Sequence, residues 1–327
     1  MVIAVLALGA LDPPRGAAQS PAKPARIGYL AVGSLAAPEL RPRLDAIRRG
    51  LRELGFVEGQ NLAIEARGAD GNVERLPALA GELVQLKLDV IVAASTPAAR
   101  AARQATTTIP IVAIAMGDPV RDGLVASLNR PGGNVTGSTF LGPELVPKRL
   151  ELLKEALPRA TRIAVLWHHG AFSERTTDDM LKASDVAARR LGIRLLVAGV
   201  HRPDDIEGAF ATWDRERAEA LVTLPSSMLF SEAPRLVSLA AKHRLPAMFN
   251  GVEFVDVGGL FAYGASISDL NRRGGFYAAQ ILKGARPADL PVEQPTSFEF
   301  AVNLRTAKTL GVTVPSPLVL RASRVIE

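Results

Sequence analysis

The chain has 327 residues, of which 48% are hydrophobic and 22% are charged, and its formal net charge is +6. This length allows two domains, and the composition is that of a globular protein with a large core. The absence of cysteine excludes disulfides, thiol catalysis, zinc–thiolate sites and a lipid-bearing N-terminal cysteine. Basic residues alternate with acidic ones, as in "DRERAEA", so we expect solvated helix faces and no nucleic-acid partner.

The segment Val2–Leu11 reads "VIAVLALGAL" and is an unbroken run of apolar and small residues. The run is too short to span a bilayer, but it has the length of a signal-peptide core. No basic residue precedes it, so either the start is truncated or the run is a buried first strand. We favour a truncated signal with cleavage near Ala18 or Ser20, which makes residues 1–25 a signal peptide with its linker and places the mature protein in the periplasm.

From Arg26 onward, short apolar runs alternate with amphipathic stretches. The strands we predict are "RIGYLAV", "NLAIEAR", "LDVIVAAS" and "IPIVAIAM". The helices we predict between and after them are "RPRLDAIRRGLRELG", "NVERLPALAGELVQLK", "TPAARAARQAT" and "DPVRDGLVASLNR". The run "LDVIVAAS" is apolar throughout, which is typical of a strand buried on both faces of a parallel sheet.

The next stretch, Arg130–Phe140, reads "RPGGNVTGSTF" and approaches the pattern of a phosphate-binding loop. Ser138 stands where that loop needs a lysine, and the stretch follows a predicted helix instead of a strand, so we set this reading aside. Asn134 begins a formal glycosylation site, yet nothing in the sequence argues for that modification. We interpret the stretch as a turn followed by a strand that crosses between two halves of the protein.

A second series of similar size follows. Its predicted strands are "TRIAVLW", "IRLLVAGV", "AEALVTL", "LPAMFN", "GGLFAYGAS" and "PTSFEFAVN". Its predicted helices are "VPKRLELLKEALP", "SERTTDDMLKASDVAARRLG", "PDDIEGAFATWDRERA", "SEAPRLVSLAAKHR", "ISDLNRRGGFYAAQILKG" and "LRTAKTLG". Two such series predict an α/β protein with two doubly wound parallel-sheet lobes, a multi-strand hinge and a cleft between the lobes. We expect lobe boundaries at 26–140 plus about 265–296, and at 141–264 plus about 297–327.

Several stretches together resemble a known family. In the first half they are "LRELGFVEGQNLAIEAR", "PIVAIAMGDPV" and "GLVASLNRPGGNVTG". In the second half they are "KRLELLKEALP", "FNGVEFVDVGGLFAYG", "AAQILKGARPADLPVEQPTSFEFAVNLRTAKTLGV" and the closing "VIE". The chain resembles the ABC-transporter substrate-binding proteins of the type I periplasmic-binding fold, in the branch that includes binders of tryptophan and other aromatic amino acids. The resemblance implies a soluble receptor that closes around a small ligand and docks on a membrane permease.

In such a fold the ligand meets the loops that follow the strands, so we select candidate residues there. In the first lobe, Ser95 and Thr96 lie at the start of a predicted helix, where they could bind a ligand carboxylate. A role as a helix cap is an equally good interpretation of each. Asp118 follows the fourth strand and suits a ligand amine, with capping as its alternative. Ser34, after the first strand, is a weaker candidate of the same kind.

In the second lobe, the candidates again follow predicted strands. Two aromatic residues in this group suit an apolar or aromatic ligand, with core packing as the alternative. These candidates are Trp167, His168, Ser226, Asn250, Glu253 and Tyr263.

No catalytic motif emerges from the sequence, and we expect no enzyme, no metal and no cofactor. The pair His168-His169 lacks supporting carboxylates, and the acid pairs Asp178-Asp179 and Asp204-Asp205 fall at predicted helix starts, where acids cap. The sequence therefore predicts a monomeric periplasmic receptor of an ABC importer that binds an amino acid or similar small carboxylate, a class that includes the aromatic amino acids. Two alternatives stay open: a sensory protein of the same fold that feeds a signalling partner, and a cytoplasmic α/β enzyme.

Overall fold

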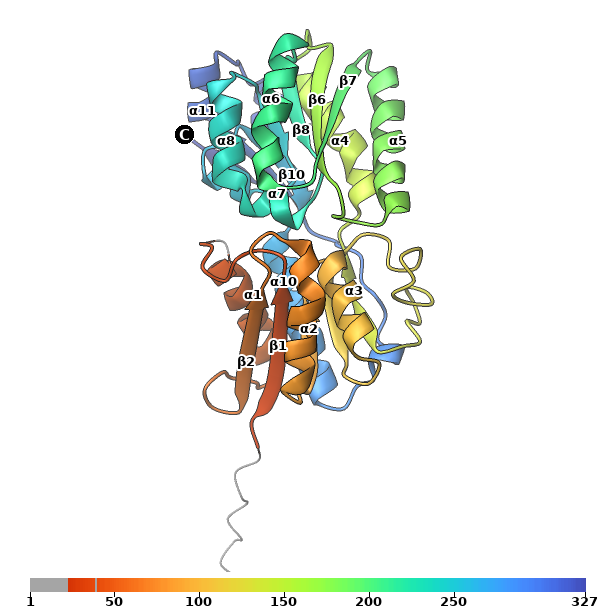
Figure 1. Ribbon diagram of the computed structural model, residues 1–327. Helices are drawn as coiled ribbons and strands as arrows, with labels where there is room; N and C mark the ends of the chain where they lie inside the picture. Colours follow the sequence, from red (N-terminus) through yellow and green to blue (C-terminus); the bar gives the residue numbers. More distant parts are fainter. Residues whose placement is uncertain (1–22, 39) are drawn as a thin grey trace, which may run out of the picture.

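The computed structural model describes residues 23–38 and 40–327. They form two α/β lobes, and the first half of the chain builds the lower lobe of Figure 1. We call the lower one lobe 1 and the upper one lobe 2. The apolar run and the cleavage sites expected near the amino terminus lie outside the described residues.

Lobe 1 is built on a parallel sheet with the strand order β2-β1-β3-β4-β5. The strands are β1 (Ala25–Ala31), β2 (Leu62–Gly68), β3 (Val90–Ala93), β4 (Ile111–Met116) and β5 (Val135–Thr139). The helices of this lobe are α1 (Leu40–Arg52), η1 (Val73–Arg75), α2 (Leu76–Gln85), α3 (Thr96–Ala105), α10 (Ile267–Leu282) and η3 (Pro287–Asp289).

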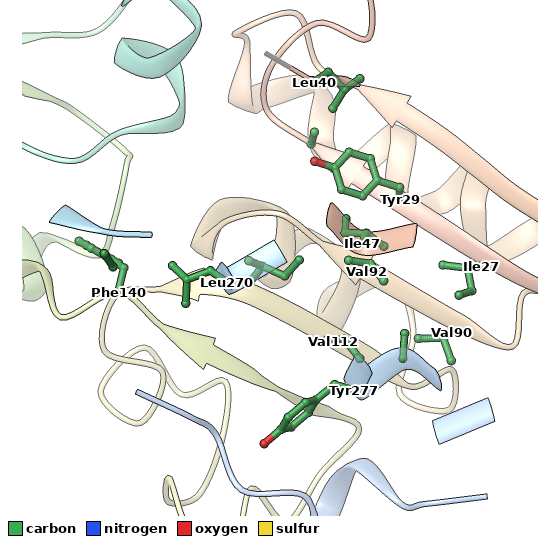
Figure 2. Close-up of a cluster of buried hydrophobic side chains, with 14 of the residues drawn as sticks. Ile27, Tyr29, Leu40, Ile47, Val90, Val92, Val112, Phe140, Leu270 and Tyr277 are labelled. Atoms are coloured by element: carbon green, nitrogen blue, oxygen red, sulfur yellow. The ribbon is translucent and has the colours of Figure 1, made fainter. Parts of the chain in front are cut away.

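Helices cover both faces of this sheet, as the apolar strands predicted. Alternate residues of a strand point to opposite faces. Ile27 and Tyr29 therefore join the cluster under α1 and α10, part of which Figure 2 shows, while Leu30 joins the cluster under α2 and α3.

The two helices on the first face, α1 and α10, come from opposite ends of the chain and pack backbone to backbone. A Cβ atom at Gly50 of α1 would lie 1.9 Å from the carbonyl oxygen of Arg272 in α10, so this position accepts only glycine. Glu53 and Arg272 form an ion pair across the same contact, with 2.8 Å between Nη1 and Oε1. The contact fixes α10, which follows a strand of lobe 2, onto lobe 1.

Lobe 2 contains a sheet with the order β12-β11-β10-β9-β8-β6-β7, in which only the β10–β11 pair is antiparallel. Its strands are β6 (Arg162–His168), β7 (Arg194–Val200), β8 (Ala220–Thr223), β9 (Ala247–Phe249), β10 (Phe261–Ala265), β11 (Phe298–Asn303) and β12 (Arg324–Ile326). Its helices are α4 (Gly142–Ala156), α5 (Glu174–Arg190), η2 (Pro203–Asp205), α6 (Ile206–Arg215), α7 (Ser227–Ser231), α8 (Ala233–Lys242), α9 (Glu253–Asp256), α11 (Leu304–Leu310) and α12 (Ser316–Arg321).

The chain passes between the lobes three times: from β5 to α4, from β10 to α10, and before β11. The first and third passages are joined, because the amide of Thr139 donates to the carbonyl of Glu293 and the amide of Glu293 donates to that of Gly137. Gly137 has φ of 136°, and a Cβ there would lie 1.8 Å from the carbonyl oxygen of Ala113. The glycine in "NVTGSTF" thus lets β5 approach an irregular part of β4 closely.

One predicted element is wrong: residues 118–130 form turns, although the pattern of "DPVRDGLVASLNR" indicated a helix. The first turn does close, since the amide of Asp122 donates to the carbonyl of Asp118. Gly123 then adopts φ of 67°, and its carbonyl accepts from Arg103 of α3 instead of continuing a helix. The short elements α12 and β12 were not predicted at all.

Candidate ligand-binding site

A cavity lies between the two lobes, at the carboxyl ends of strands from both sheets. Lobe 1 contributes residues that follow β3 and lie in β4, together with side chains of α1 and α10. Lobe 2 contributes α4 and the segments that follow β6, β8 and β9. This edge is where open parallel sheets bind their ligands, because the helix starts and the loops converge there.

The walls of the cavity are largely aromatic and aliphatic. Phe140, at the end of β5, stacks on Phe172 of lobe 2 with ring centroids 4.9 Å apart. Phe230 of α7 and Leu270 of α10 also line the space. Figure 2 shows Phe140 and Leu270 beside each other at one end of the lobe 1 cluster. Such walls suit a solute with an apolar body.

Arg149 of α4 is the most unusual residue of the lining, because its side chain is charged and only 1% exposed. Its Nε donates to the carbonyl oxygen of Tyr263 at 2.7 Å. Its Nη1 is buried and finds no hydrogen-bond partner within the described part of the chain. Burial lowers the pKa of this guanidinium to about 9, so it stays protonated at neutral pH. A buried cation with a free N–H is an energetic cost that a carboxylate or another anion would relieve.

Five neutral polar side chains join Arg149, namely Ser95, Ser226, Ser227, Asn250 and Asn271. Ser95 caps α3 and Ser226 caps α7, each accepting from backbone amides of its helix. Asn250 accepts from the hydroxyl of Thr223 at 3.3 Å. Asn271 donates to a carbonyl of its own helix, and its Oδ1 is buried without a partner in the described residues. The cavity therefore combines apolar walls with a few convergent polar groups.

Of the residues proposed from the sequence, Ser95, Ser226 and Asn250 line the cavity. Thr96 and His168 lie one layer behind it. The Thr96 hydroxyl accepts from the amide of Gly117 at 2.9 Å, which holds the loop after β4. His168 is 4% exposed and shares a 2.9 Å hydrogen bond between its Nδ1 and the Ser226 hydroxyl. Burial lowers the pKa of His168 to about 4, so its ring is neutral at pH 7.

The two other candidates of lobe 1 stand outside the cavity lining. Asp118 accepts from the backbone amides of Val120 and Arg121 and forms an ion pair with the Arg121 side chain. It borders a separate hollow beside β5. The Ser34 hydroxyl accepts from the amide of Ala36 at 3.3 Å. Both side chains thus accept from backbone amides of the turns that follow them, and neither of these turns continues into a helix.

Three candidates of lobe 2 also stand outside the lining. Trp167 packs on His169 with ring centroids 3.9 Å apart. Tyr263 presents its carbonyl to Arg149, while its ring packs near Phe298. Glu253 has a buried Oε2 without a partner in the described residues, and burial raises the pKa of its carboxyl.

The lobes touch on both sides of the cavity. On one side, Arg121 of lobe 1 pairs with Asp179 of α5 in lobe 2. On the other side, the Arg43 guanidinium of α1 lies 5.1 Å from the ring centre of Phe230 in lobe 2. These contacts between the lobes are those of a closed cleft.

The loop-based reasoning missed the residues that helices bring to the cavity, above all Arg149. A signal for it exists in "VPKRLELLKEALP", where Val146, Leu150 and Leu153 form the buried stripe of the helix. Arg149 falls on that stripe at helical spacing, and a charge on an apolar face calls for a partner.

Other kinds of site receive no support from the described residues. Within them, no three His, Cys, Asp or Glu side chains gather as metal ligands would. Within the same ranges, no helix has the length and apolar character needed to cross a bilayer.

The two parallel-sheet lobes, the hinge and the enclosed cavity define a binding protein of the type I periplasmic fold. The sequence matches the family described as ABC transporter substrate binding protein over residues 33–326. The chain belongs to this family, which confirms the resemblance seen in the sequence. Proteins of this family bind small solutes and work with ABC permeases.

Similar proteins include characterised amino-acid binders. The "Tyrosine-binding protein" of Clostridioides difficile (strain R20291) is 29% identical over 276 residues, which cover 83% of this chain and 78% of that protein. A Streptococcus pneumoniae structure in complex with L-Trp is 28% identical, covering 93% of this chain and 100% of the other, with a TM-score of 0.83. A ligand-free, open substrate-binding protein from Clostridium difficile is 27% identical, covering 93% and 99%, with a TM-score of 0.65. The TM-score to this open structure is thus lower than the TM-score to the tryptophan complex.

Proposed function

We propose that this protein is the periplasmic receptor of an ABC importer and that it binds a small carboxylate with an apolar body, the class that includes amino acids. The observation that carries this proposal is Arg149, a buried guanidinium that lines the cavity and whose Nη1 has no partner among the described residues. A guanidinium matches the planar geometry of a carboxylate.

The binding step follows from the geometry. The ligand carboxylate accepts from Arg149 of lobe 2, while its body lies between the aromatic walls. Closure of the hinge brings Phe140 and Phe172 together and excludes water, which strengthens the charge-assisted hydrogen bond. The monomer presents surfaces of both lobes to the permease only when it is closed. It has no nucleic-acid partner and catalyses no reaction.

A panel of matched acids and amides tests the ligand class. Each pair has one body and differs only in carboxylate or carboxamide, and thermal shift finds binding before calorimetry measures it. A true ligand stabilises the native state by about 2.7 kcal/mol at a hundredfold excess over its Kd. We expect acids to bind and their amides to fail. Equal binding of acid and amide, or binding of neither across the panel, would refute the carboxylate receptor.

Export is tested separately. The full chain is expressed in a Gram-negative host, and the periplasmic fraction is sequenced from its amino terminus. A mature start after residue 18 supports the periplasmic assignment, whereas an intact chain that stays in the cytoplasm contradicts it.

A further inference from the structure

The charged side chains that line the cavity are all positive. Arg149 and Arg43 both line it, one from each lobe. The remaining described residues of the lining are serines, asparagines and apolar side chains, with no carboxylate among them. The cavity thus presents two positive charges to its ligand and no negative one.

Acidic side chains around the cleft do not change this balance. Asp118 and Asp179 both pair with Arg121. Glu293 in the hinge forms two hydrogen bonds with Arg273. Asp118 and Asp179 share one arginine, Glu293 has its own, and none of the three carboxylates lines the cavity.

Glu253 is a further acid to consider, since it lies close to the cavity wall. A Cβ at Gly251 would meet both its Oε2 and the ring of Phe230, which lines the cavity. Glu253 itself does not line the cavity. Burial raises the pKa of its carboxyl, and the nearby charge of Arg43 opposes that shift. The lining itself therefore holds two arginines and no carboxylate.

An amino acid would fit this lining badly at one point. Its carboxylate would meet Arg149, but its ammonium would enter a space whose lining has two cations and no carboxylate. Like charges at short range in a desolvated site repel strongly, and a buried ammonium needs a charged partner. An anion without an ammonium group gains the first interaction and avoids the second.

The free acceptor of Asn271, which lines the cavity, calls for a hydrogen-bond donor. Its Nδ2 donates to the carbonyl of Ile267 at 2.7 Å, which fixes the orientation of the amide. Oδ1 is buried and has no partner among the residues described. A neutral donor such as a hydroxyl satisfies it without adding charge.

We propose that the ligand is an anionic organic acid that has an apolar body and no ammonium group, either a 2-hydroxy acid or an unsubstituted carboxylic acid. This inference rests on the proposed function and narrows it. The cavity would select against amino acids through the excess positive charge of Arg149 and Arg43, and it would hold the carboxylate at Arg149.

Matched triples of ligands test the inference by calorimetry on the full mature chain. Each triple keeps one body and places ammonium, hydroxyl or hydrogen at the 2-position: phenylalanine, 3-phenyllactate and 3-phenylpropanoate, with corresponding indole and isobutyl sets. We expect the tighter of the two anions to bind at least tenfold more tightly than the amino acid. An amino acid that binds as tightly as both anions overturns the inference and leaves the carboxylate receptor standing. If no carboxylate binds, the proposed function itself fails.

A variant that changes the charge of the cavity tests whether this charge sets the ligand preference. Asn250→Asp adds a carboxylate to the cavity and keeps an acceptor for the hydroxyl of Thr223. We expect this variant to lose at least tenfold in affinity for the preferred anion and to narrow or reverse the preference over the amino acid. The melting temperature of the unliganded variant checks that the fold persists. A folded variant with the wild-type order of affinities would show that cavity charge does not set the selectivity.

Discussion

Replacing Arg149 by methionine distinguishes the effect of this buried charge on stability from its role in ligand binding. The substitution keeps a long side chain but removes the guanidinium, whose only partner in the described residues is the carbonyl of Tyr263. Losing that hydrogen bond costs about 1–3 kcal/mol, while replacing buried charge by apolar atoms is neutral or stabilising by about 1–4 kcal/mol. We therefore expect the unliganded variant to be as stable as the wild type or more stable.

Binding should change in the opposite direction. A hydrogen bond to a charged group contributes about 1.5–3 kcal/mol, and a loss of about 2 kcal/mol weakens the affinity about 30-fold. Calorimetry gives the affinity, and urea denaturation without ligand gives the stability. Lys148→Met is the matched control, since Lys148 is the exposed neighbour of Arg149 on the same helix. A variant that binds within threefold of wild type, or one that no longer folds, would refute this reasoning.

Three further changes test other parts of the structure. Asp179→Asn removes the ion pair with Arg121 between the lobes, which is partly exposed, so calorimetry should show affinity about 1.4- to 5-fold weaker with an unchanged unliganded melting point; an unchanged affinity would mean that the pair does not support closure. Gly50→Ala should destabilise the protein in urea by about 1–3 kcal/mol, because its Cβ would overlap the Arg272 carbonyl, and wild-type stability would contradict that packing. The pKa of His168 is lowered from 6.5 to about 4, so the unfolded state binds the proton first as the pH falls. Stability should be complete above pH 6.5 and decline by about 3 kcal/mol toward pH 4; His168→Gln should reduce this decline, and an equal decline in both proteins would assign it to other groups.

The fold could be predicted because its signals are local. The apolar run that became β3 is continuous since helices cover both faces of its sheet. The long helix α5 begins at its serine cap and ends before Gly192, which adopts φ of 66°. The helix predicted at 118–130 is wrong because a contact between distant segments decides the structure there. Its spacing of apolar residues is helical, but Gly123 and a hydrogen bond from a distant helix interrupt it, and the sequence does not show that contact.

The site could be predicted only in part, for a related reason. Ser95, Ser226 and Asn250 follow strands, so the rule that ligands meet the carboxyl edge of a sheet led to the cavity that they line. Their contact with a ligand stays a prediction. Arg149 and Asn271 come from helix interiors, and which helix side chains reach the cleft depends on how two lobes pack. That packing joins segments far apart in the chain, such as α1 and α10, and no local pattern encodes it.

Arg149 also links recognition to closure. In an open cleft, water would solvate its Nη1, whereas contact between the lobes removes that water and leaves the N–H without a partner in the described structure. Closure of the empty protein therefore carries a desolvation cost that a bound carboxylate removes. A ligand shifts a conformational equilibrium only by its differential affinity for the two states, and this buried hydrogen bond supplies such a difference. Apolar solutes of the same shape would contact Phe140 and Phe172 but would leave that cost in place. Under the proposed function, the guanidinium would make the closed form, which a permease would recognise, depend on the charge of the solute as well as on its shape.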